Sequence, residues 1–163
     1  MKRTELLAPA GDYASLIAAF NAGADAVYLA GKQFGARAYA GNFEEDELLQ
    51  ALDYAHLHGK KIYLTLNTLI KESEFSSIRE YLTPYYNNGL DGIIIQDLGL
   101  IPYLKNEFPD LDLHASTQMT VNNYRSAKWL KEQGLCRVVP SRELSLTELQ
   151  EIKEKAGIEV EAF

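Results

Sequence analysis

Four hydrogen-bonding side chains gather where a strand pattern gives way to a helical one: His114, Ser116, Thr117 and Gln118. Residues 111–115 alternate apolar and polar side chains, which is typical of a strand with two different faces. In a parallel barrel, polar groups at the carboxyl end of a strand line the place where chemistry occurs. We therefore predict a binding pocket here. The alternative is a polar strand-to-helix turn whose side chains only cap the next helix.

The same alternation gives each predicted strand one polar face. Its members are Glu5, Tyr28, Tyr63, Thr65, Asn67, Gln96, His114, Ser116, Arg137, Glu159 and Glu161. The residues nearest the predicted carboxyl ends form our candidate pocket: Asn67, Gln96, His114, Ser116 and Gln118. For the charged members, a structural ion pair of Arg137 with Glu5, Glu159 or Glu161 is an equal alternative to a site, because unpaired buried polar groups are costly.

Two arginines and one tyrosine are the candidates for binding an anionic part of a substrate. Arg37 and Tyr39 lie in a long loop, residues 31–42, and loops of this length are functional or disordered. Arg142 follows a later strand pattern. Guanidinium groups suit carboxylates and phosphates. The alternatives are that Arg37 pairs with the acidic run at residues 44–47 and that Tyr39 anchors the loop together with its phenylalanines.

Nucleophilic and metal sites are not indicated by the spacing of cysteine and histidine. Cys136 begins its predicted strand and His114 lies near the end of its own, so we expect them roughly 10 Å apart, too far for a catalytic pair. His56 and His58 are two residues apart near a helix end and do not share a face. We predict no metal site and assign no catalytic residue.

Alternating strand and helix patterns would position these side chains. Strands are predicted near residues 5–9, 24–29, 61–67, 91–96, 111–116, 136–140 and 158–163. Helices are predicted near residues 13–22, 44–58, 73–88, 97–109, 122–133 and 145–156, with Asp12, Ser73, Asp97 and Ser145 as caps. Pro84 should kink the third helix or divide it into two segments. This alternation predicts an α/β fold with a parallel, TIM-barrel-like sheet of about seven strands and six helices.

Composition limits the class of protein. The 163 residues are 47% hydrophobic and 24% charged, as in an ordinary globular domain, and the formal net charge is −7. This charge argues against a generally basic nucleic-acid surface. No apolar run is long enough to cross a membrane. The single cysteine excludes an internal disulfide and is typical of the reducing cytoplasm.

A complete eight-unit barrel needs about 250 residues. We therefore expect residues 1–163 to be the N-terminal part of a barrel domain, with the seventh helix and the eighth unit supplied elsewhere. Open strand edges are sites of pairing with other chains, so self-association through these edges is a further expectation.

Seven blocks of this sequence resemble peptidase family U32, the bacterial collagenase-like proteins. They are ELLAPAG at 5–11, GADAVYL at 23–29, FGARAYAGNF at 34–43, TLNT at 65–68, QD at 96–97, HASTQM at 114–119 and RELS at 142–145. The resemblance covers essentially the whole chain and implies a barrel-like N-terminal domain.

The resemblance implies two competing functions for the complete protein. One is a hydrolase acting on collagen-like peptides. The other is oxygen-independent hydroxylation of tRNA or rRNA bases, or of a quinone precursor, with an iron–sulfur cluster and in some relatives prephenate as oxygen donor. The His-Gly-x-x-Cys segment of the family would follow residue 163, so we expect no cofactor in this fragment and no activity of the fragment alone. A non-catalytic binding or assembly module remains the third alternative.

Overall fold

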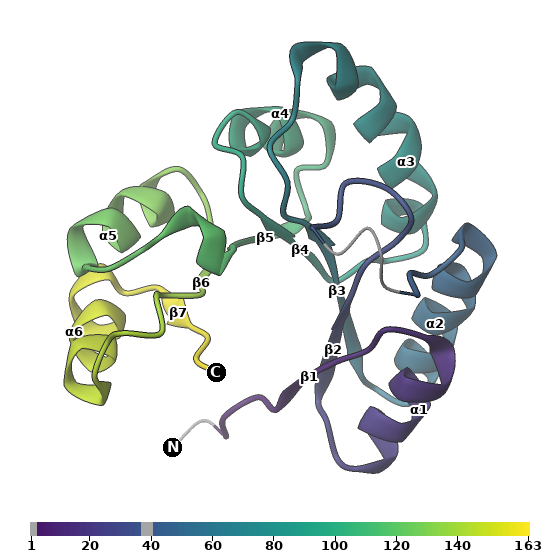
Figure 1. The fold of residues 1–163 in the computed structure, drawn as a ribbon, viewed down its shortest axis with the longest axis horizontal. Coiled ribbons are helices and arrows are strands. Elements are labelled where there is room, and N and C mark those ends of the chain that lie inside the picture. The colour runs from purple at the N-terminus through teal and green to yellow at the C-terminus, as the bar shows by residue number, and fades with distance from the viewer. Residues whose placement is uncertain (1–2, 37–40) are drawn as a thin grey trace. The chain divides into compact units, whose positions relative to one another are not determined.

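Strands and helices alternate along the chain in the computed structural model, which describes residues 3–36 and 41–163 (Figure 1). The strands are β1 (Leu7–Pro9), β2 (Ala26–Leu29), β3 (Lys61–Leu66), β4 (Gly92–Ile95), β5 (Asp112–Ala115), β6 (Arg137–Val138) and β7 (Glu159–Val160). The α-helices are α1 (Tyr13–Asn21), α2 (Glu45–Leu57), α3 (Phe75–Asn87), α4 (Leu100–Glu107), α5 (Tyr124–Glu132) and α6 (Leu146–Ala156). Two 3₁₀ turns, η1 (Glu72–Glu74) and η2 (Thr117–Met119), complete the described elements.

The strands form one sheet in the order of the sequence, from β1 to β7. The pairs β1–β2, β2–β3, β5–β6 and β6–β7 are parallel. Sequential parallel neighbours require a crossover between strands, and the helices supply it. The predicted α/β class is therefore confirmed, and so is its number of strands and helices in the described part of the chain.

The chain divides into two compact units, and the first comprises residues 1–66 and 71–92. In this unit, Tyr28 of β2 pairs with Tyr63 of β3. The Tyr63 hydroxyl donates to the carboxylate of Glu5 at 3.1 Å, so two residues of the predicted polar face meet here. The hydrophobic core of this unit is aliphatic and includes Leu16, Val27, Leu52, Leu64, Ile78 and Leu82.

The second unit comprises residues 67–70 and 93–163. Its register pairs His114 of β5 with Arg137 of β6, and Arg137 with Glu159 of β7. Helices α5 and α6 pack against each other, and Ala127, Leu130, Ile152 and Ala156 are their buried residues. All five residues of the predicted pocket belong to this unit.

Local sequence explains where helices α1 and α6 begin. The Asp12 carboxylate accepts from the Ser15 backbone N–H at 2.7 Å and begins α1 as predicted. Ser145 and Glu148 form the predicted capping box of α6. The helix then ends at Gly157, whose φ of 62° places it in the left-handed region. None of the described helices is long and apolar enough to span a lipid bilayer.

Two predicted helix starts are wrong, and so is the predicted division of the third helix into two segments at Pro84. Ser73 lies within η1, and α3 begins two residues later. Helix α4 begins at Leu100, so Asp97 is not its N-cap. Helix α3 is continuous through Pro84, because the missing N–H removes only one hydrogen bond from a helix of 13 residues whose inner face is buried.

Candidate functional site

The carboxyl end of β5 forms a tight turn built on Ser116. The Ser116 backbone N–H donates to the Ile95 carbonyl of β4 at 2.8 Å, and its hydroxyl accepts from the Gln118 N–H at 3.3 Å. The Ser116 hydroxyl also lies 3.5 Å from the Gln118 side-chain oxygen. Ser116 is buried and Gln118 is exposed. The hydroxyl of Ser116 therefore has the predicted capping role, and the Gln118 side chain is accessible to solvent.

Backbone strain accompanies this turn. Thr120 ends η2 with φ 56° and ψ 50°, the left-handed region that β-branched residues rarely adopt. Such a conformation costs on the order of 1–3 kcal/mol and persists where the surrounding structure holds it. Strain of this kind clusters at ligand-binding sites, so its position two residues after Gln118 supports a binding role for this turn.

Asp97 joins a second part of the site to the end of β4. Its carboxylate accepts from the Ile70 N–H at 3.1 Å and from the Gly99 N–H at 2.7 Å. The first bond ties residues 67–70, which begin with Asn67, to the residue that follows Gln96. From the sequence, Asp97 was predicted only as a helix cap. The sequence does place this carboxylate just after a buried strand. Loops meet at the ends of strands, so a carboxylate there could have been predicted to accept from their backbone N–H groups.

Replacing Asp97 by alanine should lower the free energy of unfolding by about 1–2 kcal/mol, because two backbone N–H groups lose a charged acceptor. We expect faster hydrogen exchange at Ile70 and Gly99. Asp53→Ala, on the exposed side of α2, is the matched control and should change neither quantity. Unchanged exchange at Ile70 in the Asp97 variant would contradict the positioning role.

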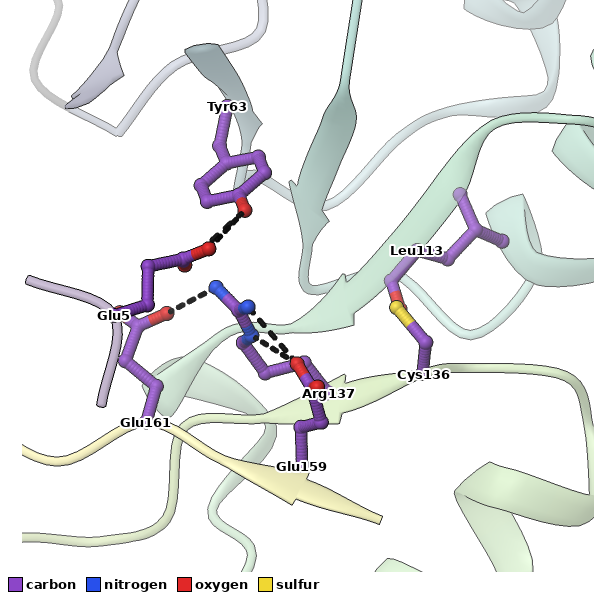
Figure 2. Close-up of polar contacts among 7 residues, drawn as sticks. All are labelled: Glu5, Tyr63, Leu113, Cys136, Arg137, Glu159 and Glu161. Carbon is purple, nitrogen blue, oxygen red and sulfur yellow. Dashed lines mark hydrogen bonds and ion pairs between the residues drawn. The ribbon is translucent and has the colours of Figure 1, made fainter. Parts of the chain in front are cut away.

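Arg137 of β6 faces two carboxylates, those of Glu159 on β7 and of Glu161 just after β7 (Figure 2). Its Nη2 donates to Glu159 at 2.9 Å, and its Nη1 lies 3.9 Å from Glu161. The ion pairs predicted for Arg137 with Glu159 and Glu161 are therefore confirmed. This part of the polar face is occupied by internal pairing, which leaves the carboxyl-end residues as the candidate site.

Cys136 lies much closer to His114 than predicted. The ligand atoms of Asp112, His114 and Cys136 all lie within 4.8 Å of one another. The expected separation of roughly 10 Å is wrong because the register pairs His114 with Arg137, so Cys136 lies beside Leu113 on the neighbouring strand. The Cys136 N–H and thiol both donate to the Leu113 carbonyl, at 3.0 and 3.5 Å (Figure 2).

The thiol of Cys136 is not activated for nucleophilic attack. Burial raises its pKa to about 11, and the neighbouring Asp112 carboxylate adds to this rise. At neutral pH the sulfur is therefore protonated, whereas a nucleophilic cysteine reacts as the thiolate. Proximity to His114 alone does not make a catalytic pair.

The long loop is anchored by its phenylalanines, as predicted. Phe43 is buried and its N–H donates to the Ala30 carbonyl at 3.0 Å. Phe34 packs edge-on against Tyr81 of α3, with ring centroids 5.5 Å apart. Arg37 and Tyr39, two of the candidates for anion binding, lie outside the described residues.

Arg142, the third candidate for anion binding, is exposed and lies over the ring of Phe163, with its Cζ 4.6 Å from the ring centroid. This contact orients the guanidinium by a cation–π interaction. The predicted pocket residues are thus placed in three groups: the Ser116–Gln118 turn, the Asn67–Gln96 region tied by Asp97, and His114 beside Asp112 and Cys136.

Comparison with known proteins identifies the relatives of this chain. The model of Peptidase family U32 matches residues 11–163. The chain belongs to this family. The predicted resemblance is therefore confirmed over nearly the whole sequence.

Curated U32 relatives include RNA hydroxylation proteins and a protease. The chain is 38% identical to the tRNA hydroxylation protein P1 of Bacillus subtilis, over 99% of this chain and 38% of the relative. It is 38% identical to the 23S rRNA 5-hydroxycytidine C2501 synthase of Escherichia coli, over 99% of this chain and 24% of the relative. It is 39% identical to an uncharacterized protease of Methanocaldococcus jannaschii, over 100% of this chain and 40% of the relative. The chain thus spans about a quarter to two fifths of these relatives.

Solved structures support the fold. The U32 peptidase Mk0906 superimposes with a TM-score of 0.81 at 18% identity, over 98% of this chain and 68% of that one. Tryptophan synthase from M. tuberculosis gives a TM-score of 0.66 at 16% identity, over 98% of this chain and 73% of that one. At these identities the likeness concerns architecture alone, and it confirms the TIM-barrel-like prediction.

Proposed function

We propose that this chain forms the base-binding part of a protein that hydroxylates bases of tRNA or 23S rRNA. The observation that carries the proposal is its similarity, along nearly its whole length, to proteins named for tRNA hydroxylation in several bacteria and to a 23S rRNA 5-hydroxycytidine synthase. Such a role would place the protein in the cytoplasm, in agreement with its single cysteine.

The candidate pocket has the chemistry that an extruded base requires. Enzymes that modify a base inside folded RNA or DNA take it out of the stack and hydrogen-bond its edge. Amides such as those of Asn67, Gln96 and Gln118 each offer both a donor and an acceptor. The net charge of −7 makes this chain a poor general binder of phosphates. In this proposal the chain contributes base recognition, and contacts to the RNA backbone come from other parts of the complete protein.

An iron–sulfur cluster, which the resemblance implies for the complete protein, does not fit the residues of this chain. Such clusters are typically held by four cysteine thiolates, and these 163 residues contain one. A cluster would therefore need its ligands from outside this sequence. The role we assign to this chain is to bind and orient the substrate.

Proteolysis is the second candidate function, supported by the relative from M. jannaschii that is named as a protease. Two features of the site weigh against it. The Cys136 thiol is protonated at neutral pH because of its raised pKa. The Ser116 hydroxyl contacts Gln118, a side chain that cannot serve as a general base. We therefore rank it below RNA hydroxylation.

The test is a complementation experiment with the complete protein encoded by the gene. In cells lacking it, mass spectrometry of nucleosides from tRNA and 23S rRNA should show the loss of a hydroxylated base. Gln118→Ala should restore it about tenfold less efficiently than the unaltered protein, because one hydrogen-bonding partner of the base is lost. Gln50→Ala, on the exposed surface of α2, is the matched control and should restore it fully.

Deletion that leaves every hydroxylated nucleoside at its normal level would refute the proposal. Cleavage of a collagen-like peptide by the purified protein would then favour the peptidase. Equal complementation by Gln118→Ala and Gln50→Ala, with unchanged melting temperatures, would remove Gln118 from the site.

A further inference from the structure

We propose that Asp112, His114 and Cys136 bind a Zn²⁺ ion. Their ligand atoms lie within 4.8 Å of one another. A carboxylate oxygen, an imidazole nitrogen and a thiolate sulfur are three of the ligand types that zinc takes in proteins. This proposal does not rest on the proposed function, and it replaces the expectation from the sequence that the chain has no metal site.

The backbone places the three residues on two neighbouring segments of the sheet. Asp112 and His114 are two residues apart on β5, and in a strand this spacing puts both side chains on the same face. Cys136 directly precedes β6, and its N–H donates to the Leu113 carbonyl at 3.0 Å. The cysteine is thus fixed beside the residue that lies between the other two ligands. Sites built on strands hold their ligands more rigidly than sites on loops.

The distances are close to those of a tetrahedral site. With metal–sulfur and metal–nitrogen bonds of about 2.3 and 2.0 Å, neighbouring ligand atoms are about 3.3–3.5 Å apart. Binding of the ion would draw the ligand atoms, now within 4.8 Å of one another, to these shorter distances. Asp112 is exposed and can make this movement, while His114 is 1% exposed and provides a fixed nitrogen. Three protein ligands leave a fourth position for water or another ligand.

The charges around the thiol favour a cation. Asp112 carries one negative charge within the cluster, and Glu159 lies on β7 beside the strand that Cys136 precedes. Arg137 is the positive neighbour, and its guanidinium faces Glu159 at 2.9 Å and Glu161 at 3.9 Å. Its charge is therefore offset by two carboxylates. A divalent ion at the cluster would neutralise Asp112 and the thiolate together.

Two of the three ligands lie at the amino-terminal side of the strands, whereas His114 is the third of the four residues of β5. Asp112 is the first residue of β5, and Cys136 precedes the first residue of β6. In barrels this end contributes to stability, whereas the carboxyl end contributes to catalysis. We therefore assign the ion a structural role: it joins β5 to the start of β6.

Cobalt titration of the metal-free 163-residue chain tests the site. Co²⁺ replaces Zn²⁺ in sites of this kind, and a bound thiolate gives a charge-transfer band in the near ultraviolet. Because the sequence has one cysteine, this band reports on Cys136 alone. We expect a saturable band with one Co²⁺ per chain that Zn²⁺ abolishes by competition. Cys136→Ser should show no band, and Asp112→Asn should weaken Co²⁺ binding at least about tenfold.

Matched controls separate the site from surface binding. Asp110→Asn changes an exposed carboxylate two residues before Asp112 and should leave Co²⁺ affinity unchanged, as should His58→Asn. Zn²⁺ at about 100 times its Kd should raise the melting temperature of the unaltered chain by roughly 5–10 °C and should leave that of Cys136→Ser unchanged. Absence of a band at excess Co²⁺, or equal affinity of Asp112→Asn and the unaltered chain, would overturn the proposal.

Discussion

Replacing Arg137 by methionine is expected to lower the free energy of unfolding by about 3–5 kcal/mol. The side chains of Arg137 and Glu161 are only 11% and 10% exposed, so their charges are largely removed from water. Methionine fills a similar volume but leaves the Glu161 carboxylate buried without its cationic partner. Urea unfolding followed by the fluorescence of Trp129, which belongs to the same compact unit, measures the loss.

The two glutamates allow a matched comparison. Glu159 is 53% exposed although its oxygen lies nearer to Arg137, so Glu159→Gln should cost below about 1 kcal/mol. The double variant Arg137→Met/Glu161→Gln should recover part of the loss, because the charge of Glu161 is removed together with that of Arg137. A loss below about 1 kcal/mol for Arg137→Met alone would show that Glu161 is solvated in the native protein.

This ion pair is an example of what the sequence could predict. Alternation along each strand is a local property, and it was enough to place Arg137, Glu159 and His114 on one polar face. The register of the strands then brings them together, as the pairing of His114 with Arg137 and of Arg137 with Glu159 shows. Helix caps such as Ser145 were equally predictable, since they depend on residues three positions apart.

Features that depend on distant residues were not predictable. The separation of Cys136 from His114 was estimated from positions along two strands, but the offset between neighbouring strands is fixed by pairing and is absent from the sequence of either strand. The bond from the Ile70 N–H to Asp97 likewise joins loops 27 residues apart. The left-handed backbone of Thr120 contradicts the local preference of threonine and follows from its surroundings. The sequence therefore predicted which types of residue make up the candidate site, but it did not predict the distances between them.

Replacing Gly31 by alanine is expected to cost about 2–3 kcal/mol. A Cβ atom at this position would lie 2.0 Å from the hydroxyl oxygen of Tyr81, well inside van der Waals contact. The Tyr81 ring is held edge-on between Phe34 and Tyr85, at centroid distances of 5.5 and 5.3 Å, so it cannot easily move aside. In an unfolded chain, alanine has fewer conformations than glycine and so favours folding. This effect on the unfolded state would stabilise the variant. A loss of stability in thermal or urea unfolding must therefore come from the clash with Tyr81 in the folded state.

The Tyr81 hydroxyl explains why this clash should be removable. It is buried, with no hydrogen-bond partner among the described residues, and burial raises its pKa. Tyr81→Phe should therefore be neutral or slightly stabilising, because a desolvated polar group without a partner is deleted. In that background, the nearest atom to an alanine Cβ at position 31 is the ring carbon Cζ at 3.2 Å, a tight contact that a small ring shift relieves.

The pair of substitutions forms a double-mutant cycle with an expected coupling of about 1–2 kcal/mol. Gly31→Ala should be strongly destabilising alone and cost below about 1 kcal/mol when Tyr81 is phenylalanine. Gly11→Ala is the matched control, because a Cβ there meets its nearest atom at 3.9 Å. If Gly31→Ala cost the same in both backgrounds, the Tyr81 hydroxyl would not be its obstacle. Coupling of the expected size would instead show that position 31 requires glycine because of the Tyr81 hydroxyl. Gly31 begins the loop that carries Arg37 and Tyr39, so this contact fixes the start of that loop.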